Sequence, residues 1–211
     1  MTVDALWDLR VRTPRLELRL PTEDELVELF RVAEAGIHPP EEMPFFVPWT
    51  DDLRLDAFVE YHRDTWAVWR PEQWLLNLFT FLDGRPIGSQ GVGAEEFAVR
   101  REVETGSWLG AQYQGRGLGT EQRAAVLELA FAHLGAEVAV SGSIVHNLSS
   151  QRVSEKLGYR VTGTRTIAPR GDPVEHFDYR LERDAWSCPI PVEVEGIKPA
   201  LPLFGAVTPS S

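Results

Sequence analysis

Three alternating glycines stand between an extended stretch and a helical one, in the segment QYQGRGLGTE at residues 112 to 121. Gly115, Gly117 and Gly119 allow positive φ angles and let another group approach the backbone closely. Peptide N–H groups at the start of a helix point outward at the positive end of its dipole, which favours anions. The segment therefore predicts an anion cradle, and the alternative is a tight strand-to-helix turn without a ligand.

Two common phosphate-binding loops do not match this segment. A P-loop ends in Lys followed by Ser or Thr, whereas Gly119 directly precedes Thr120. A dinucleotide fingerprint has the spacing G-x-G-x-x-G and an acidic residue at the end of the next strand, whereas Glu137 would begin a strand here. The pattern that remains is Q-x-x-G-x-G, made by Gln114, Gly117 and Gly119.

A second polar stretch, NLSSQRVSEKLGY, follows about thirty residues downstream, after a predicted helix and strand. Asn147 or Ser149 would cap a short helix that ends at Gly158. Together the two stretches resemble the GNAT acyltransferases, in which a Q-x-x-G-x-G loop holds coenzyme A and the second motif reads N-x-x-S-x-x-x-x-x-K-x-G-F/Y. Both motifs thus occur in the order and spacing of that family.

Other segments resemble one branch of this family. TPRLELR near the start and YRLERDAW near the end are similar to the ribosomal-protein N-acetyltransferase (RimJ/RimL-like) branch, so the likeness covers about residues 12 to 186. MPFFVPWT, GSWLG and PLFG resemble an actinobacterial subgroup for which succinyl-CoA has been proposed as the donor. The resemblance implies transfer of an acetyl or succinyl group from coenzyme A to a primary amine by direct attack.

The resemblance also implies where the acyl-CoA binds. The strand ending at SWLGAQ would splay from the SGSIV strand, and the pantetheine arm would pair with backbone groups in the gap. Amides of the glycine turn would hold the pyrophosphate. The residues implied in binding are Trp108, Leu109, Ala111, Gln114, Gly115, Arg116, Gly117, Leu118, Gly119, Thr120, Asn147 and Ser150.

Three residues are implied in catalysis. A main-chain N–H near Leu109 would polarise the thioester carbonyl, with a plain β-bulge as the alternative. Ser150 matches the serine that gives a proton to the departing thiolate, and Glu175 matches the acidic residue that accepts the amine proton, directly or through water. A water-exposed serine and a surface glutamate are the alternatives. Many superfamily members use a tyrosine one helical turn later, where this chain has Ser154.

The composition is typical of one soluble globular domain. The chain has 211 residues, of which 43% are hydrophobic and 25% are charged. A formal net charge of −11 argues against binding to nucleic acid or an anionic membrane, and the single Cys188 excludes an internal disulfide. His146 and His176 lie beside strand ends, where histidines are more often structural or solvated, and no spacing indicates a metal. Without a signal-like start or an apolar span, we expect a cytoplasmic protein.

The N-terminal half predicts the elements that must position these residues. A strand over residues 16–20 precedes a helix that starts at Glu23 and is capped by Thr22. Residues 36–50, rich in proline and aromatics, predict a loop that packs Phe45, Phe46 and Trp49 on the core or forms a substrate wall. A helix over 53–69 follows, with Phe58, Tyr61, Trp66 and Trp69 as its apolar positions.

The remaining pattern predicts a meander followed by alternating helices and strands. Two β runs flank Asp83-Gly84, a hairpin signal, and a third precedes the glycines. The next helix ends at Gly135, and two closing strands follow the second motif. The resemblance implies an α/β GNAT fold with a mixed, mostly antiparallel central sheet flanked by helices.

The sequence also predicts how the chain divides. Residues 1–188 would form the GNAT acyltransferase domain, and residues 189–211 a proline-rich arm packed on the same domain or on a partner subunit of a homo-oligomer. The alternative functions are a non-catalytic acyl-CoA-binding or regulatory protein and a nucleotide-binding regulator.

Overall fold

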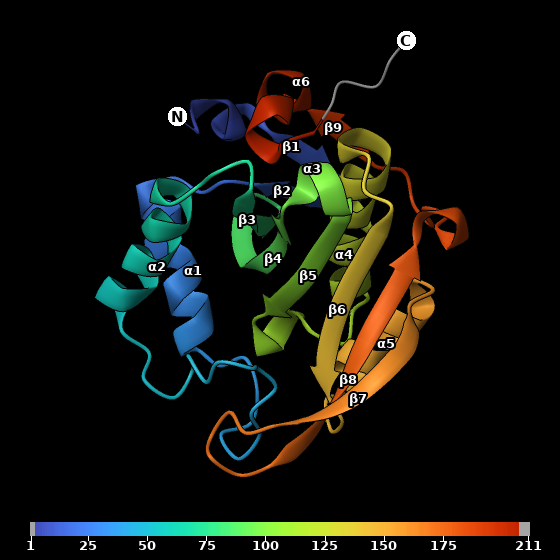
Figure 1. The fold of residues 1–211 in the computed structure, drawn as a ribbon. Helices are drawn as coiled ribbons and strands as arrows, with labels where there is room; N and C mark the ends of the chain where they lie inside the picture. Colours follow the sequence, from blue (N-terminus) through green and yellow to red (C-terminus); the bar gives the residue numbers. More distant parts are fainter. Residues whose placement is uncertain (1–2, 207–211) are drawn as a thin grey trace.

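A nine-stranded sheet forms the centre of the computed structural model, which describes residues 3–206 (Figure 1). Its strand order is β7-β8-β6-β5-β4-β3-β2-β1-β9. The strands are β1 (Arg10–Arg12), β2 (Leu16–Arg19), β3 (Gln73–Leu82), β4 (Arg85–Glu95), β5 (Glu102–Leu109), β6 (Val138–Ile144), β7 (Arg160–Ile167), β8 (Val174–Glu182) and β9 (Glu193–Glu195). All neighbouring strands in this order are antiparallel except β5 and β6, which are parallel, so the predicted mixed, mostly antiparallel sheet is confirmed.

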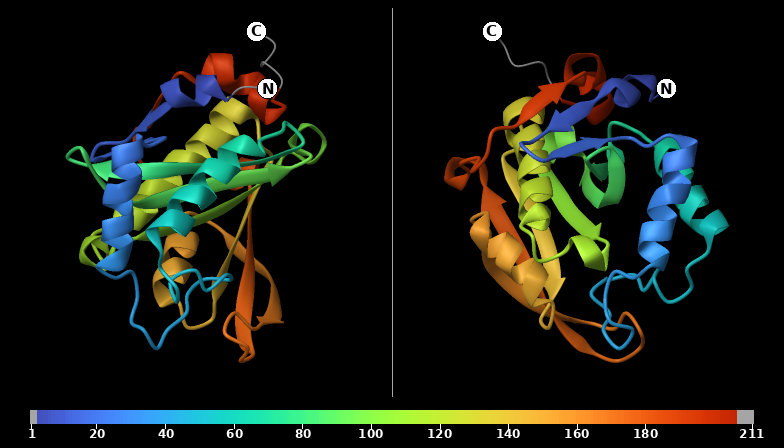
Figure 2. Two further views of the ribbon diagram at one scale, coloured as in Figure 1. Left: turned by 90° about the vertical axis from the view of Figure 1, so that its left-hand side faces the viewer. Right: turned by 180° about the vertical axis from the view of Figure 1, so that it is seen from behind.

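Helices cover both faces of the sheet (Figure 2). The helical segments are η1 (Asp4–Asp8), α1 (Glu23–Glu34), α2 (Leu55–Ala67), α3 (Phe97–Arg100), η2 (Ala111–Tyr113), α4 (Leu118–Glu128), η3 (Leu129–Leu134), α5 (Leu148–Lys156), η4 (Arg183–Ala185), α6 (Ile197–Ala200) and η5 (Leu201–Phe204). The larger core lies between the sheet and α4, and a smaller one, with Phe30, Phe58 and Phe79, lies under α1 and α2. The predicted α/β arrangement is thus present.

Local signals in the sequence set several of the element boundaries. Thr22 and Glu25 form a capping box at the start of α1, as the Thr22 cap predicts. Asp83 and Gly84 have φ angles of 51° and 76° and form the two-residue turn of the predicted β3–β4 hairpin. Gly135, with φ of 76°, ends the helix that α4 and η3 form together.

The buried face of α2 differs from the predicted one. The helix ends at Ala67, so Trp69 is buried beyond its end, and Tyr61 is 52% exposed. Phe58 is buried as predicted, and His62, four residues later on the same face, is buried with it. The apolar pattern was misleading because His62, neutral and enclosed by aromatic rings, takes an inward position.

The strand β9 forms an edge of the sheet by pairing with β1, with Val194 opposite Val11. It places α6 and η5 beside the N-terminal segment, where Trp69 and Trp74 donate hydrogen bonds to carbonyls of η5. The described part of the predicted arm thus packs on its own chain, whereas residues 207–211 lie outside the described residues. The division at residue 188 stays a prediction.

Candidate active site

Strands β5 and β6 are paired along only part of their length. Their parallel register runs from Glu102 opposite Val138 to Glu104 opposite Val140, and no pairs follow although both strands continue. The predicted splay therefore begins after Glu104, and the two strands diverge toward Leu109 and Ile144. This opening exposes backbone groups in the middle of the sheet.

Side chains replace the backbone ladder where the strands part. Ser141 donates its hydroxyl to the carbonyl of Thr105 at 2.8 Å. Arg123 of α4 donates to the hydroxyls of Ser107 on β5 at 3.1 Å and Ser141 on β6 at 3.2 Å. Its guanidinium is 3% exposed and pairs with no carboxylate among residues 3–206. We call Thr105, Ser107, Arg123 and Ser141 the polar clip, and it holds the apex of the splay.

The glycine turn lies between the end of β5 and the start of α4. Gly115 and Gly117 have φ angles of 72° and 79°, so two of the three glycines adopt a left-handed conformation that is unfavourable for other residues. Gly119 is helical, and a Cβ there would touch Leu109 and Val153 at 3.8 Å. The turn is exposed from Gly115 to Gly117, and α4 begins at Leu118, so its first N–H groups face outward.

A basic residue outside both motifs lies beside this turn. Arg15 forms an ion pair with Glu121 at 2.5 Å and donates to the carbonyl of Arg116 at 3.1 Å. Its guanidinium lies 3.5 Å from where a Cβ of Gly117 would be. Arg15 and Arg116 therefore bring positive charge to the predicted pyrophosphate position.

Two of the residues implied in coenzyme A binding have their polar groups engaged within the protein. The Gln114 amide donates to the carbonyls of Ile37 and Leu109, at 2.7 and 2.8 Å, and the N–H of Ala111 donates to Gly36 at 2.9 Å. These bonds fix the end of β5 against the loop after α1. Both residues thus support the site's shape through bonds that the sequence motif did not predict.

The backbone N–H of Leu109 is not engaged with the neighbouring strand β4. Gly110 donates its N–H to the carbonyl of Ile87 on β4. Because successive N–H groups of a strand point to opposite sides, the N–H of Leu109 points away from β4 and toward the gap beside β6. This orientation is the one required of the predicted carbonyl-polarising group.

The start of α5 borders the open end of β6. Asn147 caps this helix, and its Oδ1 accepts the N–H of Ser150 at 3.0 Å. Ser150 is half-buried in the first turn, while Leu148 and Ser149 are exposed. Ser154, one turn later, is buried and accepts a 3.4 Å hydrogen bond from Arg123. Ser154, which stands where many superfamily members have a tyrosine, is therefore hydrogen-bonded to the polar clip.

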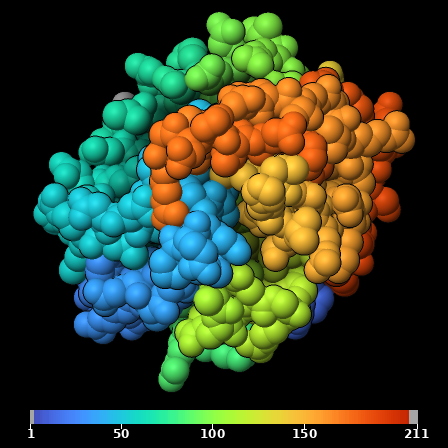
Figure 3. All heavy atoms as spheres, turned by 90° about the horizontal axis from the view of Figure 1, so that it is seen from below, coloured from blue at the N-terminus to red at the C-terminus, as the bar shows by residue number. Residues whose placement is uncertain are grey.

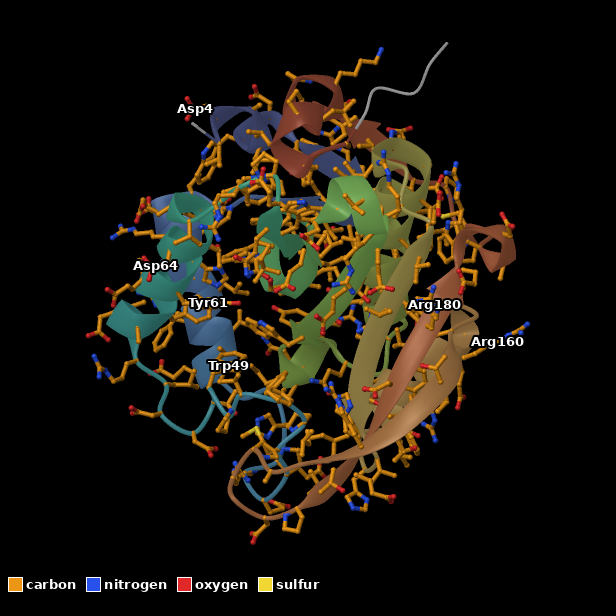
Figure 4. All side chains as sticks on the ribbon, viewed as in Figure 1. Asp4, Trp49, Tyr61, Asp64, Arg160 and Arg180 are labelled. Carbon is orange, nitrogen blue, oxygen red and sulfur yellow. The ribbon has the colours of Figure 1, made fainter. Side chains whose placement is uncertain are left out.

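A groove of about 1130 Å³ lies on the opposite face of the sheet, between α2 and strands β3 to β5. Figure 4 shows Tyr61 on α2 and Trp49 of the preceding loop at one side of it, with Arg180 of β8 on the far side. Phe45, Trp49 and Trp108 line one end, and the Trp49 and Trp108 rings are 5.5 Å apart. Residues 36–50 thus supply a groove wall as well as core packing.

Glycines form the floor of this groove. Asn77, Gly91 and Gly106 lie opposite one another on β3, β4 and β5. A Cβ at Gly106 would meet no heavy atom within 4 Å, so the space above this residue is open to the groove. Glu104 lies two residues before Gly106 on β5 and also lines the groove, exposed and without an ion pair to any described residue.

Polar groups stand at the far end of the glycine floor. Asn77 donates to the Tyr61 hydroxyl at 3.3 Å, and His62 lines the groove with its Nδ1 unpaired within the described chain. Burial lowers the pKa of His62 to about 4, so this side chain is neutral at pH 7. The three side chains offer hydrogen bonds at this end of the groove.

Glu175 and His176 project to opposite faces of β8. Glu175 is exposed and shares its face with Tyr179 and Leu181, which pack in the core on the α4 side. His176 shares its face with Asp178 and Arg180, and Arg180 lies opposite the groove-lining Val140. The structure therefore does not bring Glu175 to the groove, which the prediction of an amine base requires.

Two distant segments meet below the groove (Figure 3). Arg170, at the tip of the β7–β8 hairpin, pairs with Asp51 of the loop before α2 at 2.5 Å. The Arg165 guanidinium lies 5.9 Å from the centre of the exposed Phe46 ring. These contacts, which we call the strap, connect the two sides of the sheet at the open end of the splay.

Metal-binding clusters and membrane-spanning helices are both absent from the described residues 3–206. No group of three or more His, Cys, Asp or Glu side chains is arranged to hold a metal ion. No helix in this part of the chain is long and apolar enough to cross a membrane.

Sequence reasoning missed Arg15, Arg123 and Glu104. Arg15 lies in the quoted TPRLELR segment, but nothing in that segment indicates contact with a turn a hundred residues away. Arg123 sits on a helix that is buried on nearly all sides. Glu104 follows the alternation of β5, yet only the fold shows which face carries the groove.

Comparison with known proteins agrees with this geometry. Residues 15–160 match the family model described as "Acetyltransferase (GNAT) domain". Mycobacterium smegmatis RimJ, solved in complex with CoA-disulfide, superposes with a TM-score of 0.70 at 18% identity, over 85% of this chain and 90% of that one.

Two further structures are similar. A GNAT-family acetyltransferase from Bacillus anthracis has a TM-score of 0.64 at 16% identity, over 83% of this chain and 99% of its own. The microcin C7 self-immunity acetyltransferase MccE, in complex with acetyl-CoA and AMP, has a TM-score of 0.62 at 16% identity, over 80% and 93%. At these identities the likeness concerns the fold.

Proposed function

The chain belongs to the GNAT acetyltransferase family, and from this premise we propose that it transfers an acyl group from coenzyme A to a primary amine by direct attack. The observation that carries the proposal is the splay between β5 and β6, which joins two otherwise separate surfaces. The glycine turn and α5 lie on one side of it, and the groove lies on the other. A thioester in the gap could thus meet an amine arriving along the groove.

The donor's diphosphate would bind at the start of α4. Outward N–H groups and the helix dipole favour an anion there, and Gly117 lets it approach the backbone. Arg15 and Arg116 add charge from the two sides of the turn. We propose this role for the turn residues 115–120 and retain Asn147 and Ser150 beside the pantetheine arm.

The acyl group would lie in the gap, where the Leu109 N–H supports negative charge on the carbonyl oxygen as the amine attacks. The half-buried Ser150 would give a proton to the departing thiolate. Glu104, the exposed carboxylate beside the glycine floor, would attract an ammonium group into the groove. Trp108, whose side chain lines the groove, would separate the acceptor from solvent.

Titration calorimetry and an amine assay test this proposal. We expect coenzyme A to bind more tightly than ADP, because only coenzyme A has the pantetheine arm that fills the gap. We expect acyl-CoA and an amine panel together to release free thiol faster than acyl-CoA alone. Coenzyme A binding without transfer would instead indicate a non-catalytic acyl-CoA-binding protein, and equal binding of ADP would indicate a nucleotide-binding regulator.

We propose succinyl-CoA as the preferred donor over acetyl-CoA. The proposal rests on the subgroup resemblance and on the polar end of the glycine floor, since a buried carboxylate needs hydrogen-bond donors. Tyr61, His62 and Asn77 can supply them. A four-carbon acyl chain is shorter than the two strand spacings of about 4.8 Å each that separate β5 from Asn77 on β3, so bound water would bridge the carboxylate to these groups.

A comparison of the two donors tests this preference. Turnover with succinyl-CoA should exceed that with acetyl-CoA across an amine panel, and Asn77→Leu should reduce the succinyl rate more than the acetyl rate. Equal or better turnover with acetyl-CoA would contradict the proposed donor while leaving the acyl transfer intact.

We further propose that residues 1–188 act as the catalytic domain of a cytoplasmic homo-oligomer, with the C-terminal arm at or near the subunit contact. The support is the acidic composition, the single cysteine and the position of β9 at a sheet edge. Sedimentation of the full chain and of a chain ending at residue 188 would test the assembly. A monomeric full chain would contradict it.

A further inference from the structure

We propose that His176 accepts the proton of the acceptor amine, a role that neither sequence motif assigns to it. The inference rests on the acyl transfer proposed above. It starts from the two faces of β8, because only the residue on the groove face can meet an amine in the groove. His176 lies on that face, and Glu175 lies on the other.

The position of His176 along the sheet corresponds to the open end of the splay. It lies opposite Ile144, the last residue of β6, beyond the last pair between β5 and β6. Its ring leans over β6, because a Cβ on Gly142 would be only 2.2 Å from its Cε1. The imidazole thus extends from β8 across β6 in the direction of the gap, and Gly142 provides the space.

Charged groups from three strands surround the imidazole. Asp178 on β8 has Oδ1 3.2 Å from Nδ1, although the contact lacks hydrogen-bond geometry and Nδ1 remains unpaired within residues 3–206. Arg165 on β7 and Glu104 on β5 also act on the ring electrostatically. Glu104 lies opposite Val140 on β6, the strand between β5 and β8, so the carboxylate is on the groove side of the imidazole.

The environment keeps the imidazole in its basic form at neutral pH. Burial, and next the positive charge of Arg165, lower the pKa of His176, while Asp178 and Glu104 oppose that shift. A neutral imidazole can take a proton. The two nearby carboxylates would then stabilise the imidazolium that forms.

The proposed step is balanced in atoms and charge. The amine nitrogen attacks the thioester carbon, so an N–C bond forms and the C–S bond breaks. The surplus proton on nitrogen passes to the His176 imidazole, and the coenzyme A thiolate takes a proton from the Ser150 hydroxyl. Water then returns a proton to Ser150 and removes one from His176.

The test compares two neighbouring residues that differ in the face they occupy. We expect His176→Gln to lower kcat/KM by about 10²- to 10⁴-fold, the usual contribution of proton transfer by a side chain. The matched control Glu175→Gln should stay within about twofold of the wild type. Both variants should bind coenzyme A with unchanged affinity in calorimetry, which shows that they are folded.

The pH profile separates catalysis from a structural role. The wild-type rate should fall as the pH drops below about 6.5, through the lowered pKa of His176, and His176→Gln should lose this limb. His176→Ala opens space over Gly142, so added imidazole should restore part of its rate. A packing defect would not give this rescue.

Three results would overturn the assignment. Wild-type activity of His176→Gln, with loss in Glu175→Gln, would return the role to Glu175. A slower His176→Gln enzyme with an unchanged acid limb and no rescue of His176→Ala would mean a structural role. A wild-type protein that binds coenzyme A but acylates no amine would refute the proposed function itself, and the base with it.

Discussion

Replacing Gly117 by alanine should separate backbone strain from ligand binding. Gly117 has φ of 79° at the start of α4, and Gly135 has φ of 76° at the end of the continuous helix. Alanine in this conformation costs about 1–2 kcal/mol at either position. In the free protein neither methyl group would clash, since its nearest neighbours are Arg15 at 3.5 Å and Arg101 at 3.9 Å. The two variants should therefore be destabilised equally.

Coenzyme A should distinguish the two variants. A strain of 1–2 kcal/mol lowers the melting temperature by about 2–8 °C for a chain of this size. At a hundredfold excess over Kd, the ligand should stabilise the wild type and Gly135→Ala by about 2.7 kcal/mol. At Gly117 the new methyl group would stand between the diphosphate and the amides. An anion at a helix N-terminus contributes up to about 2 kcal/mol, so Kd should rise by up to about thirtyfold.

Thermal melts with and without coenzyme A, together with calorimetry, measure both effects. A Gly117→Ala protein that melts like Gly135→Ala and binds coenzyme A as tightly as the wild type would refute the diphosphate site. Weaker binding in both variants would attribute the effect to the helix as a whole. The expected result is weaker binding in Gly117→Ala alone.

Three further changes test other parts of the site. Ser150→Ala should lower kcat by about ten- to a thousandfold at unchanged donor affinity, with the exposed Ser149→Ala as its control, and an unaffected kcat would exclude general acid help from Ser150. Asp51→Asn should break the strap to Arg170 and raise KM for the acceptor without changing coenzyme A affinity in calorimetry; unchanged acceptor kinetics would remove the strap from the groove's function. His62 has a folded pKa of about 4, below its value in the unfolded chain, so its contribution to stability is full above about pH 6.5 and is lost as the pH falls toward 4. Denaturant titrations at pH 7 and pH 5 should show that the free energy of unfolding falls by about 2 kcal/mol less in His62→Phe than in the wild type. Equal decreases in the two proteins would contradict the buried, neutral state of His62.

Much of the fold follows from local signals, because each acts within a few residues. The Thr22 cap, the Asp83-Gly84 turn and the helix stop at Gly135 all depend on side chains or φ preferences next to the boundary. The two family motifs similarly located the glycine turn and the start of α5. These parts could be predicted without knowing the sheet order.

Contacts between distant segments could not be predicted in this way. Gln114 matches the loop motif, yet its amide is engaged by Ile37 and Leu109 carbonyls that only the folded chain brings near. Arg123 reads as an ordinary helix residue until Ser107 and Ser141 meet it beneath the splay. Such residues are specified by tertiary geometry, to which residue spacing gives no access.

The β8 strand shows where a sequence signal was present but incomplete. In VEHFDYRLE the apolar Phe177, Tyr179 and Leu181 alternate with polar residues, and this period of two places Glu175 with the apolar set and His176 with the polar set. The pattern thus separates the two candidates for the amine base. Only the folded sheet shows which set lies on the groove face, because Arg180 of the polar set stands opposite the groove-lining Val140 on β6. The choice of His176 therefore depends on sheet topology, although the alternation that supports it is already present in the sequence.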